Sequence, residues 1–148
     1  MAKIFFGMLQ ETNPAFVEEV KESFAKQTIM ALIGAALTRV EPGVIEITLP
    51  YRADLAQQHG YIHAGIITTI ADSACGYAAY TLMPAGSDVL AVEFKVNLLR
   101  PAKGETFIAR AEVIKPGRTL TVTRADVHAL TGEQRELVAI MQGTMMRL

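Results

Sequence analysis

Residues 64–83 read AGIITTIADSACGYAAYTLM, an apolar run that is unusually rich in small side chains. A run of this length fits either a membrane span or a buried helix. Asp72 lies near its middle, where a charge is costly in lipid. Small side chains also allow a helix to approach a sheet closely. The run therefore predicts a long buried helix.

The residues before this run predict a helix followed by a hairpin. Asn13-Pro14 is typical of a helix start, because Asn caps free N–H groups and Pro needs no donor at the first position. Amphipathic spacing continues to about Leu32, and we expect Gly34 to end the helix. Residues 35–40 and 44–49 then predict two strands, joined by a tight turn at residues 41–43.

Four β-rich stretches follow the long helix, at residues 89–99, 105–115, 119–130 and 137–146. The turns between them, such as 101–104, are short enough for consecutive antiparallel pairing. The order of elements predicts an α+β fold in which one antiparallel sheet wraps the long helix. We expect residues 1–148 to form a single domain.

The composition excludes several classes of protein. The chain has 148 residues, of which 51% are hydrophobic and 20% charged, as is typical of a globular domain. Lys plus Arg number 14 against 15 for Asp plus Glu, so no net field favours nucleic acid or an anionic membrane. Cys75 is the only cysteine, which excludes an intrachain disulfide and a cysteine-based metal cluster and fits a reducing compartment. The apolar stretch of residues 1–6 is too short for a signal-peptide core, so we expect a cytoplasmic protein. We also expect that it needs no metal or cofactor.

Residues 63–74, HAGIITTIADSA, form the most informative motif. With them the chain resembles the PaaI-like (phenylacetic-acid-degradation type) thioesterases, whose central helix opens with His-Gly-Gly and carries an acidic residue nine positions after the histidine. Gln57 and Leu99-Arg100-Pro101 also match that family, whereas Ala64 replaces the first glycine and retains its backbone N–H. The resemblance implies a hotdog fold and hydrolysis of acyl-CoA by homodimers or dimers of dimers, with active sites at the subunit interface.

Thioester hydrolysis needs a group that holds the carbonyl oxygen as it gains charge, and a group that attacks or activates water. The amides of Ala64 and Gly65 lack intrahelical acceptors and lie at the positive end of the helix dipole, so they are candidates for the oxyanion site. Asp72 supplies a carboxylate, either as a general base toward water or as a nucleophile that forms a mixed anhydride. We expect His63 to position the site, with a cap or a core histidine as the alternatives. Gln57 is a candidate to orient water or the carbonyl, or else a solvated loop residue.

The spacing of the motif adds a geometric condition. Eight residues separate Ala64 from Asp72, which is about 12 Å along a helix axis. One active site cannot use both residues from one chain. If two such helices lie antiparallel across a two-fold axis, Asp72 of one chain approaches the Ala64 amide of the other. Dimerisation is then a requirement for catalysis.

Two residues of the long helix have simpler interpretations. Asp72 would be a structural carboxylate if hydroxyls at neighbouring helical positions satisfy it, the candidates being Thr68, Thr69 and Ser73. Cys75 lies three residues after Asp72 without a positive partner nearby in sequence, which favours a buried, inert thiol over a nucleophile.

Coenzyme A, as part of the substrate, carries phosphates that need local cations. The candidates cluster at strand ends and turns: Arg100, Lys103, Lys115 and Arg118. We favour Arg118, because guanidinium binds phosphate bidentately, although each of the four would otherwise be a solvated turn residue. An acyl channel, or simply the core, would be lined by apolar residues at the end of the first helix: Ile29, Met30, Leu32 and Ile33.

Two other functions are compatible with the same sequence. A hydratase or dehydratase on this fold would need an acid–base pair at the α and β carbons of the acyl group, whereas Asp72 beside the thioester favours hydrolysis. A non-catalytic acyl-CoA-binding module would bind without turnover, and fold alone does not distinguish it from an enzyme.

Overall fold

The structure is a computed structural model that describes residues 9–148, so our interpretation of residues 1–6 lies outside the described part of the chain. Three helices, one 3-10 turn and six strands follow one another along it. Their bounds are α1 Phe16–Lys26, α2 Thr28–Ile33, β1 Ala36–Glu41, β2 Val44–Pro50, η2 Ala53–Leu55, α3 Ala64–Tyr80, β3 Val89–Leu98, β4 Thr106–Lys115, β5 Leu120–Thr131 and β6 Gln134–Arg147.

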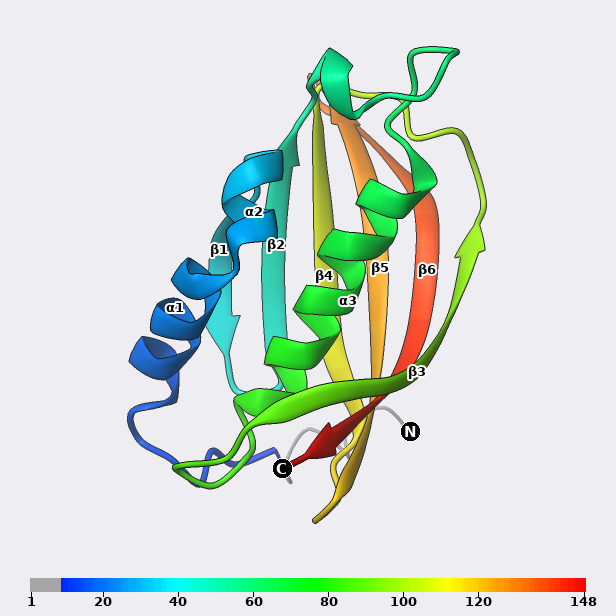
Figure 1. Cartoon of the computed structure of the whole chain (residues 1–148). Coiled ribbons are helices and arrows are strands. Elements are labelled where there is room, and N and C mark those ends of the chain that lie inside the picture. The colour runs from blue at the N-terminus through cyan, green and yellow to red at the C-terminus, as the bar shows by residue number, and fades with distance from the viewer. Residues whose placement is uncertain (1–8) are drawn as a thin grey trace.

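The six strands form one antiparallel sheet in the order β1-β2-β4-β5-β6-β3. The sheet curls around α3, and β3 curves past the C-terminal half of that helix (Figure 1). This is the α+β hotdog architecture that the resemblance predicts. Among residues 9–148, no helix combines the length and hydrophobicity that a membrane span requires. The prediction of a buried helix for the run of residues 64–83 is confirmed, with the helix ending at Tyr80.

The prediction that consecutive strands pair throughout is wrong for β3. This strand pairs with β6, while β4 pairs with β2. The segment between β3 and β4 does not form a hairpin but crosses one end of the sheet. The N–H groups of Leu99 and Arg100 donate to Val138 O of β6, and Ala102 O accepts from Ile62 N of the loop before α3. These bonds hold the crossing segment beside the start of α3.

The first helix is also shorter than the periodicity predicts. Instead of continuing to about Leu32, it breaks at Gln27, whose backbone is extended at φ −75° and ψ 95°. The Gln27 side chain is bound to α3, since its Nε2 donates to Tyr77 Oη at 2.9 Å and its Oε1 accepts from Ser73 Oγ at 3.2 Å. The second segment, α2, ends at Gly34 as predicted, in the left-handed conformation at φ 78°.

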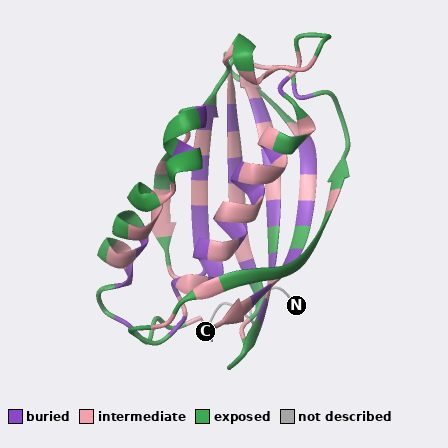
Figure 2. Cartoon of the chain, in the orientation of Figure 1, coloured by how far each residue is buried: buried purple, intermediate pink, exposed green. Residues whose placement is uncertain are grey.

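The core lies between α3 and the concave face of the sheet, and buried positions alternate with more exposed ones along the central strands (Figure 2). Many of the buried side chains on both surfaces are alanines. They include Ala71, Ala74 and Ala78 of the helix and Ala109, Ala111 and Ala125 of the strands. Small side chains on both sides let the helix lie close to the sheet.

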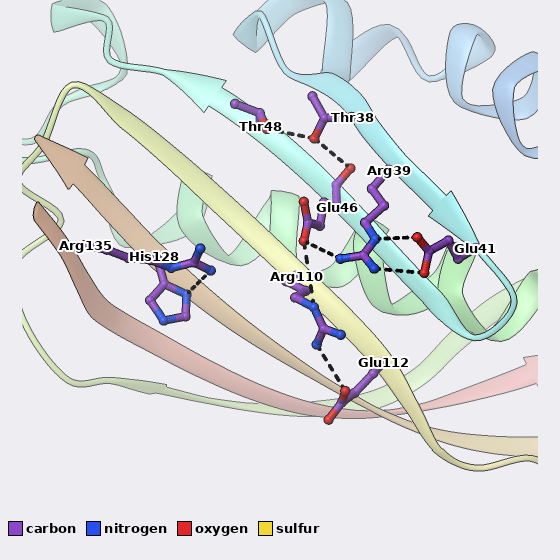
Figure 3. Close-up of polar contacts among 9 residues, drawn as sticks. All are labelled: Thr38, Arg39, Glu41, Glu46, Thr48, Arg110, Glu112, His128 and Arg135. Carbon is purple, nitrogen blue, oxygen red and sulfur yellow. Dashed lines mark hydrogen bonds and ion pairs between the residues drawn. The ribbon is translucent and has the colours of Figure 1, made fainter. Parts of the chain in front are cut away.

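The opposite face of the sheet is covered by charged side chains paired across strands (Figure 3). Glu46 of β2 lies between two arginines, 3.4 Å from Arg39 on β1 and 3.8 Å from Arg110 on β4. Arg110 also contacts Glu112 at 3.1 Å. Opposite charges on adjacent strands stabilise the pairing register of these strands. Because this face of the sheet is charged, the hydrophobic core lies on the other face only.

A buried hydroxyl joins the C-terminal end of α3 to the β1–β2 turn. Thr81 Oγ1 donates to Ala78 O and accepts from the N–H of Gly43, both at 2.7 Å. Gly43 has a φ of 72°, which few side chains tolerate, and so allows the turn to bring its N–H to the helix.

We expect Thr81→Val to destabilise the protein by about 1–3 kcal/mol, because the isosteric change leaves the buried Gly43 N–H without an acceptor. The free energy of unfolding in urea measures this. Thr38→Val is the control, since that hydroxyl is exposed and its loss should change stability by less than about 0.5 kcal/mol. Equal effects of the two changes would contradict this role for Thr81.

Candidate active site

The start of α3 is capped by His63. Its backbone is extended at φ −59° and ψ 139°, and its Nδ1 accepts from the N–H of Gly65 at 2.9 Å. A Cβ on residue 65 would lie 3.1 Å from that Nδ1, which explains glycine at this position. His63 therefore acts as a cap here, and Gly65 N–H is engaged with it. None of the hydrogen bonds within residues 9–148 uses the N–H of Ala64, which remains open to a ligand.

A cavity of about 430 Å³ opens beside this helix start. The residues that line it come from the loop before α3, from α3 itself and from the segment after β3, and include Gln57, Tyr61, Ala64, Ile67, Leu99 and Arg100. The structure therefore brings together Gln57 and Ala64, as the motif predicts. Gln57 Oε1 accepts from His59 N, and its Nε2 has no acceptor in the described part of the chain. The cavity thus offers two N–H donors from different groups.

Asp72 lies in the middle of α3 with a buried oxygen. Its Oδ1 has no hydrogen-bond partner among the described residues. The hydroxyls that might satisfy it are bound elsewhere: Thr68 and Thr69 donate to Ala64 O and Gly65 O at 2.8 Å, and Ser73 donates to Gln27. The structural alternative, a carboxylate satisfied by its helical neighbours, is therefore wrong.

Burial raises the pKa of Asp72 above its ordinary value. An unpartnered buried oxygen is rare in folded proteins and calls for an explanation. A carboxylate with a raised pKa is a stronger base than an exposed one. The same environment that makes Asp72 costly to the fold therefore suits it to accept a proton.

Asp72 faces a second cavity, of about 410 Å³. This cavity is lined by α1, by the break at Gln27, by α3 and by the beginning of β3, and includes Asp72, Ser73, Gly76 and Tyr77 of the helix. Ala64 does not line it, and Asp72 does not line the first cavity. Within one chain, the free amide and the free carboxylate thus open into different spaces, as their spacing predicts.

The four predicted phosphate-binding cations do not form one cluster in a single chain. Arg100 lines the first cavity, where it also contacts Glu136 at 3.2 Å, and Lys103 lies nearby on the same crossing segment. Lys115 and Arg118 lie at the opposite end of β4. All four lie at strand ends or turns, as predicted from the sequence, and the length of β4 separates the two pairs within one chain.

The residues predicted to line an acyl channel border neither cavity. Met30 and Ile33 are fully buried in the core, whereas Ile29 and Leu32 are exposed. Sequence reasoning missed Gln27, whose partners Ser73 and Tyr77 form a wall of the second cavity. A signal was present, since Gln27 occupies a position on the apolar face of the first helix where a polar residue needs a partner.

The remaining chemistry of the chain is limited. Burial raises the pKa of the Cys75 thiol to about 12, and the side chain is fully buried, in agreement with an inert thiol. In the part of the chain that the structure describes, no three His, Cys, Asp or Glu side chains are grouped to hold a metal ion.

Comparison with known proteins identifies relatives over most of the chain. A family model described as Thioesterase superfamily matches residues 59–136. A candidate esterase of Saccharolobus solfataricus is 31% identical over 116 residues, which are 78% of this chain and 75% of that protein. The solved structure of a thioesterase family protein from Silicibacter pomeroyi is 50% identical, with a TM-score of 0.88 over 90% of this chain and 98% of that one. The E. coli PaaI protein from the phenylacetic acid degradation operon shares the fold at 21% identity and a TM-score of 0.81, over 90% of this chain and 93% of that one.

We expect Asp72→Asn to stabilise the protein at neutral pH. A raised pKa means that the folded state binds the proton more tightly than the unfolded state. The stability of the wild type relative to Asp72→Asn is therefore greatest below the ordinary pKa of aspartate and falls as the pH rises through the raised pKa. Urea unfolding of both proteins between about pH 2 and about pH 8 measures the difference.

Asp54→Asn provides a control of opposite sign. The Arg52 guanidinium bonded to Asp54 lowers the pKa of that carboxyl, so the stability of the wild type relative to this variant should fall as the pH drops through the lowered pKa. A difference between wild type and Asp72→Asn that does not change with pH would contradict the assigned environment of Asp72.

Proposed function

The chain belongs to the thioesterase superfamily and is a thioester hydrolase, and we propose that its substrate is an acyl-coenzyme A, cleaved to the free acid and coenzyme A. The observation that carries this proposal is the pair of unsatisfied groups on α3. The N–H of Ala64 lacks an acceptor and Oδ1 of Asp72 lacks a donor within residues 9–148. A thioester carbonyl and a water molecule would supply what each group lacks.

The N–H of Ala64 binds the carbonyl oxygen of the thioester in this mechanism. It lies at the positive end of the α3 dipole, so it stabilises the negative charge that the oxygen gains in the tetrahedral intermediate. Nε2 of Gln57 lines the same cavity and is positioned to orient the carbonyl or the attacking water. His63 supports this arrangement by holding the first turn of the helix through Gly65.

Asp72 takes part in the attack on the carbonyl carbon. As a general base it takes a proton from water while the water oxygen bonds to the carbon; the C–S bond then breaks and the leaving thiolate takes up a proton. As a nucleophile, its carboxylate displaces the thiolate and forms an anhydride that water hydrolyses. Both routes use the same carboxylate and differ in whether an acyl-enzyme forms.

A dimer brings the two groups together. Among residues 9–148, the edge strand β3 is long and has no pairing partner on one side. It exposes apolar side chains that a second copy would cover, including Leu90, Val92, Phe94 and Leu98. Pairing of two such edges across a two-fold axis sets the α3 helices antiparallel. Asp72 of one subunit then faces Ala64 of the other, and the two kinds of cavity join.

The same arrangement reunites the predicted phosphate contacts. Antiparallel subunits place the turn that carries Lys115 and Arg118 of one chain at the end of the dimer where the other chain has Arg100 and Lys103. Coenzyme A phosphates would bind between these cations. We favour Arg118 for bidentate contact, since it makes no ion pair within the described chain.

We expect Asp72→Ala to abolish thiol release from acyl-CoA substrates and Ala64→Pro to lower kcat by about 10²–10³-fold. Proline is tolerated at the first position of a helix and removes only the N–H, and His63 already has the extended backbone that a residue before proline requires. Ala64→Gly keeps the N–H and is the matched control, with activity close to wild type. Release of free thiol from acetyl-, hexanoyl- and phenylacetyl-CoA measures all four proteins.

Mixed dimers of Asp72→Ala and Ala64→Pro test whether the site is shared. Refolding equal amounts of the two inactive variants together should restore about a quarter of wild-type activity, because half of the dimers are mixed and each of these has one intact site. If both groups act within one chain, mixing restores nothing. Absence of thiol release from every acyl-CoA by the wild type would exclude acyl-CoA as the substrate.

A further inference from the structure

Gly76 is a glycine that packing within the chain does not require. It lies inside the C-terminal half of α3, in right-handed helical conformation, where glycine is the poorest helix former apart from proline. A Cβ placed on it would meet no heavy atom within 4 Å. Gly65 on the same helix differs, because its missing Cβ makes room for His63. The space beside Gly76 is therefore open within the described chain.

That space belongs to the cavity that contains Asp72. Gly76 follows Asp72 by one helical turn, so the two residues are neighbours on one face of α3, and both line the cavity of about 410 Å³. Val89, Leu90 and Met145 contribute apolar walls. If the carbonyl carbon of a thioester is attacked at Asp72, the acyl chain bonded to that carbon would extend directly across Gly76.

The wall opposite α3 is fixed by hydrogen bonds. Tyr77 Oη lies 3.0 Å from Ser23 Oγ and accepts from Gln27 Nε2 at 2.9 Å, and Gln27 in turn accepts from Ser73. This network joins the α1–α2 break to the helix turn that carries Gly76. A wall of this kind cannot move aside easily, so the side chain at position 76 controls the remaining width.

We propose that Gly76 determines the size of the acyl group that the enzyme accepts. The inference rests on the proposed function, in which the thioester carbon lies at Asp72. Val89, Leu90 and Met145, which line this cavity with Gly76, are apolar and suit the hydrocarbon of an acyl group rather than the phosphates of coenzyme A. The acyl part then enters the space beside Gly76.

The test is a graded series, Gly76→Ala and Gly76→Leu, assayed for kcat/KM with acetyl-, hexanoyl- and phenylacetyl-CoA. Activity toward the most bulky accepted acyl group should fall about tenfold in Gly76→Ala and at least about a hundredfold in Gly76→Leu, with acetyl-CoA changed by less than about threefold. The melting temperature of Gly76→Ala should rise by about 2–4 °C, because alanine is the better helix former. Thr69→Ala, on the same helix but lining neither cavity, should leave the substrate profile unchanged.

Other outcomes would overturn the assignment. An unchanged acyl profile across the series, in a wild type that does hydrolyse acyl-CoA, would remove Gly76 alone and leave the proposed function intact. An equal loss with all substrates, together with dissociation of the dimer in size-exclusion chromatography, would show that the partner subunit fills the space. No hydrolysis of any acyl-CoA by the wild type would refute the proposed function and this assignment with it.

Discussion

The close approach of α3 to the concave face of the sheet is the constraint on which the rest of the structure depends. It is possible because alanines meet on both surfaces, at positions such as Ala71 and Ala74 of the helix and Ala109 and Ala125 of the strands. The shapes of the two backbones then set the position of α3, which has little freedom to shift against the sheet. Both ends of the helix are also tied, by Thr81 at one end and by the loop before His63 at the other. Groups on α3 are therefore held at fixed separations.

In the proposed mechanism, capping and oxyanion binding would compete for the same amides at the start of α3. His63 takes the N–H of Gly65, so the stability of the helix start uses one of the two donors that the motif offers and leaves that of Ala64. The two positions consequently have different requirements. A Cβ at residue 65 would press against the imidazole of His63, whereas the proposed role of residue 64 uses only its N–H. Alanine at position 64 is compatible with that requirement.

Local patterns predicted the elements well, since each depends on periodicity and turn chemistry within a short window. The long helix and all six strands were predictable in this way, although the helix ends at Tyr80 rather than continuing to residue 83. Two features were not, because distant residues determine them. The helix break at Gln27 depends on Ser73 and Tyr77, far along the chain. The order of the strands depends on where the crossing segment after β3 bonds, and a short turn fits a hairpin and a crossing equally well.

The candidate site was predictable in its components and less so in their grouping. The motif identified Ala64 and Asp72, and helix geometry predicted that they face different spaces, which the two cavities show. The cations at Lys115 and Arg118 could not be placed relative to Arg100 from sequence, because proximity of turns depends on which ends of the strands they join. Turns at both ends of one strand are necessarily far apart in a single chain.

Asp72 and Gly76 break local rules within one turn of the same helix. The first carries a buried carboxylate oxygen without a donor among the described residues, and the second is a glycine where alanine would be more stable. Such departures persist where function offsets their cost to the fold. The other cavity has donors without a carboxylate acceptor: within the described chain, Ala64 and Gln57 have free N–H groups and Arg100 is a cation, but no carboxylate lines it. In the proposed dimer, two copies of the chain related by a two-fold axis would bring the two kinds of cavity together and complete both sites at once.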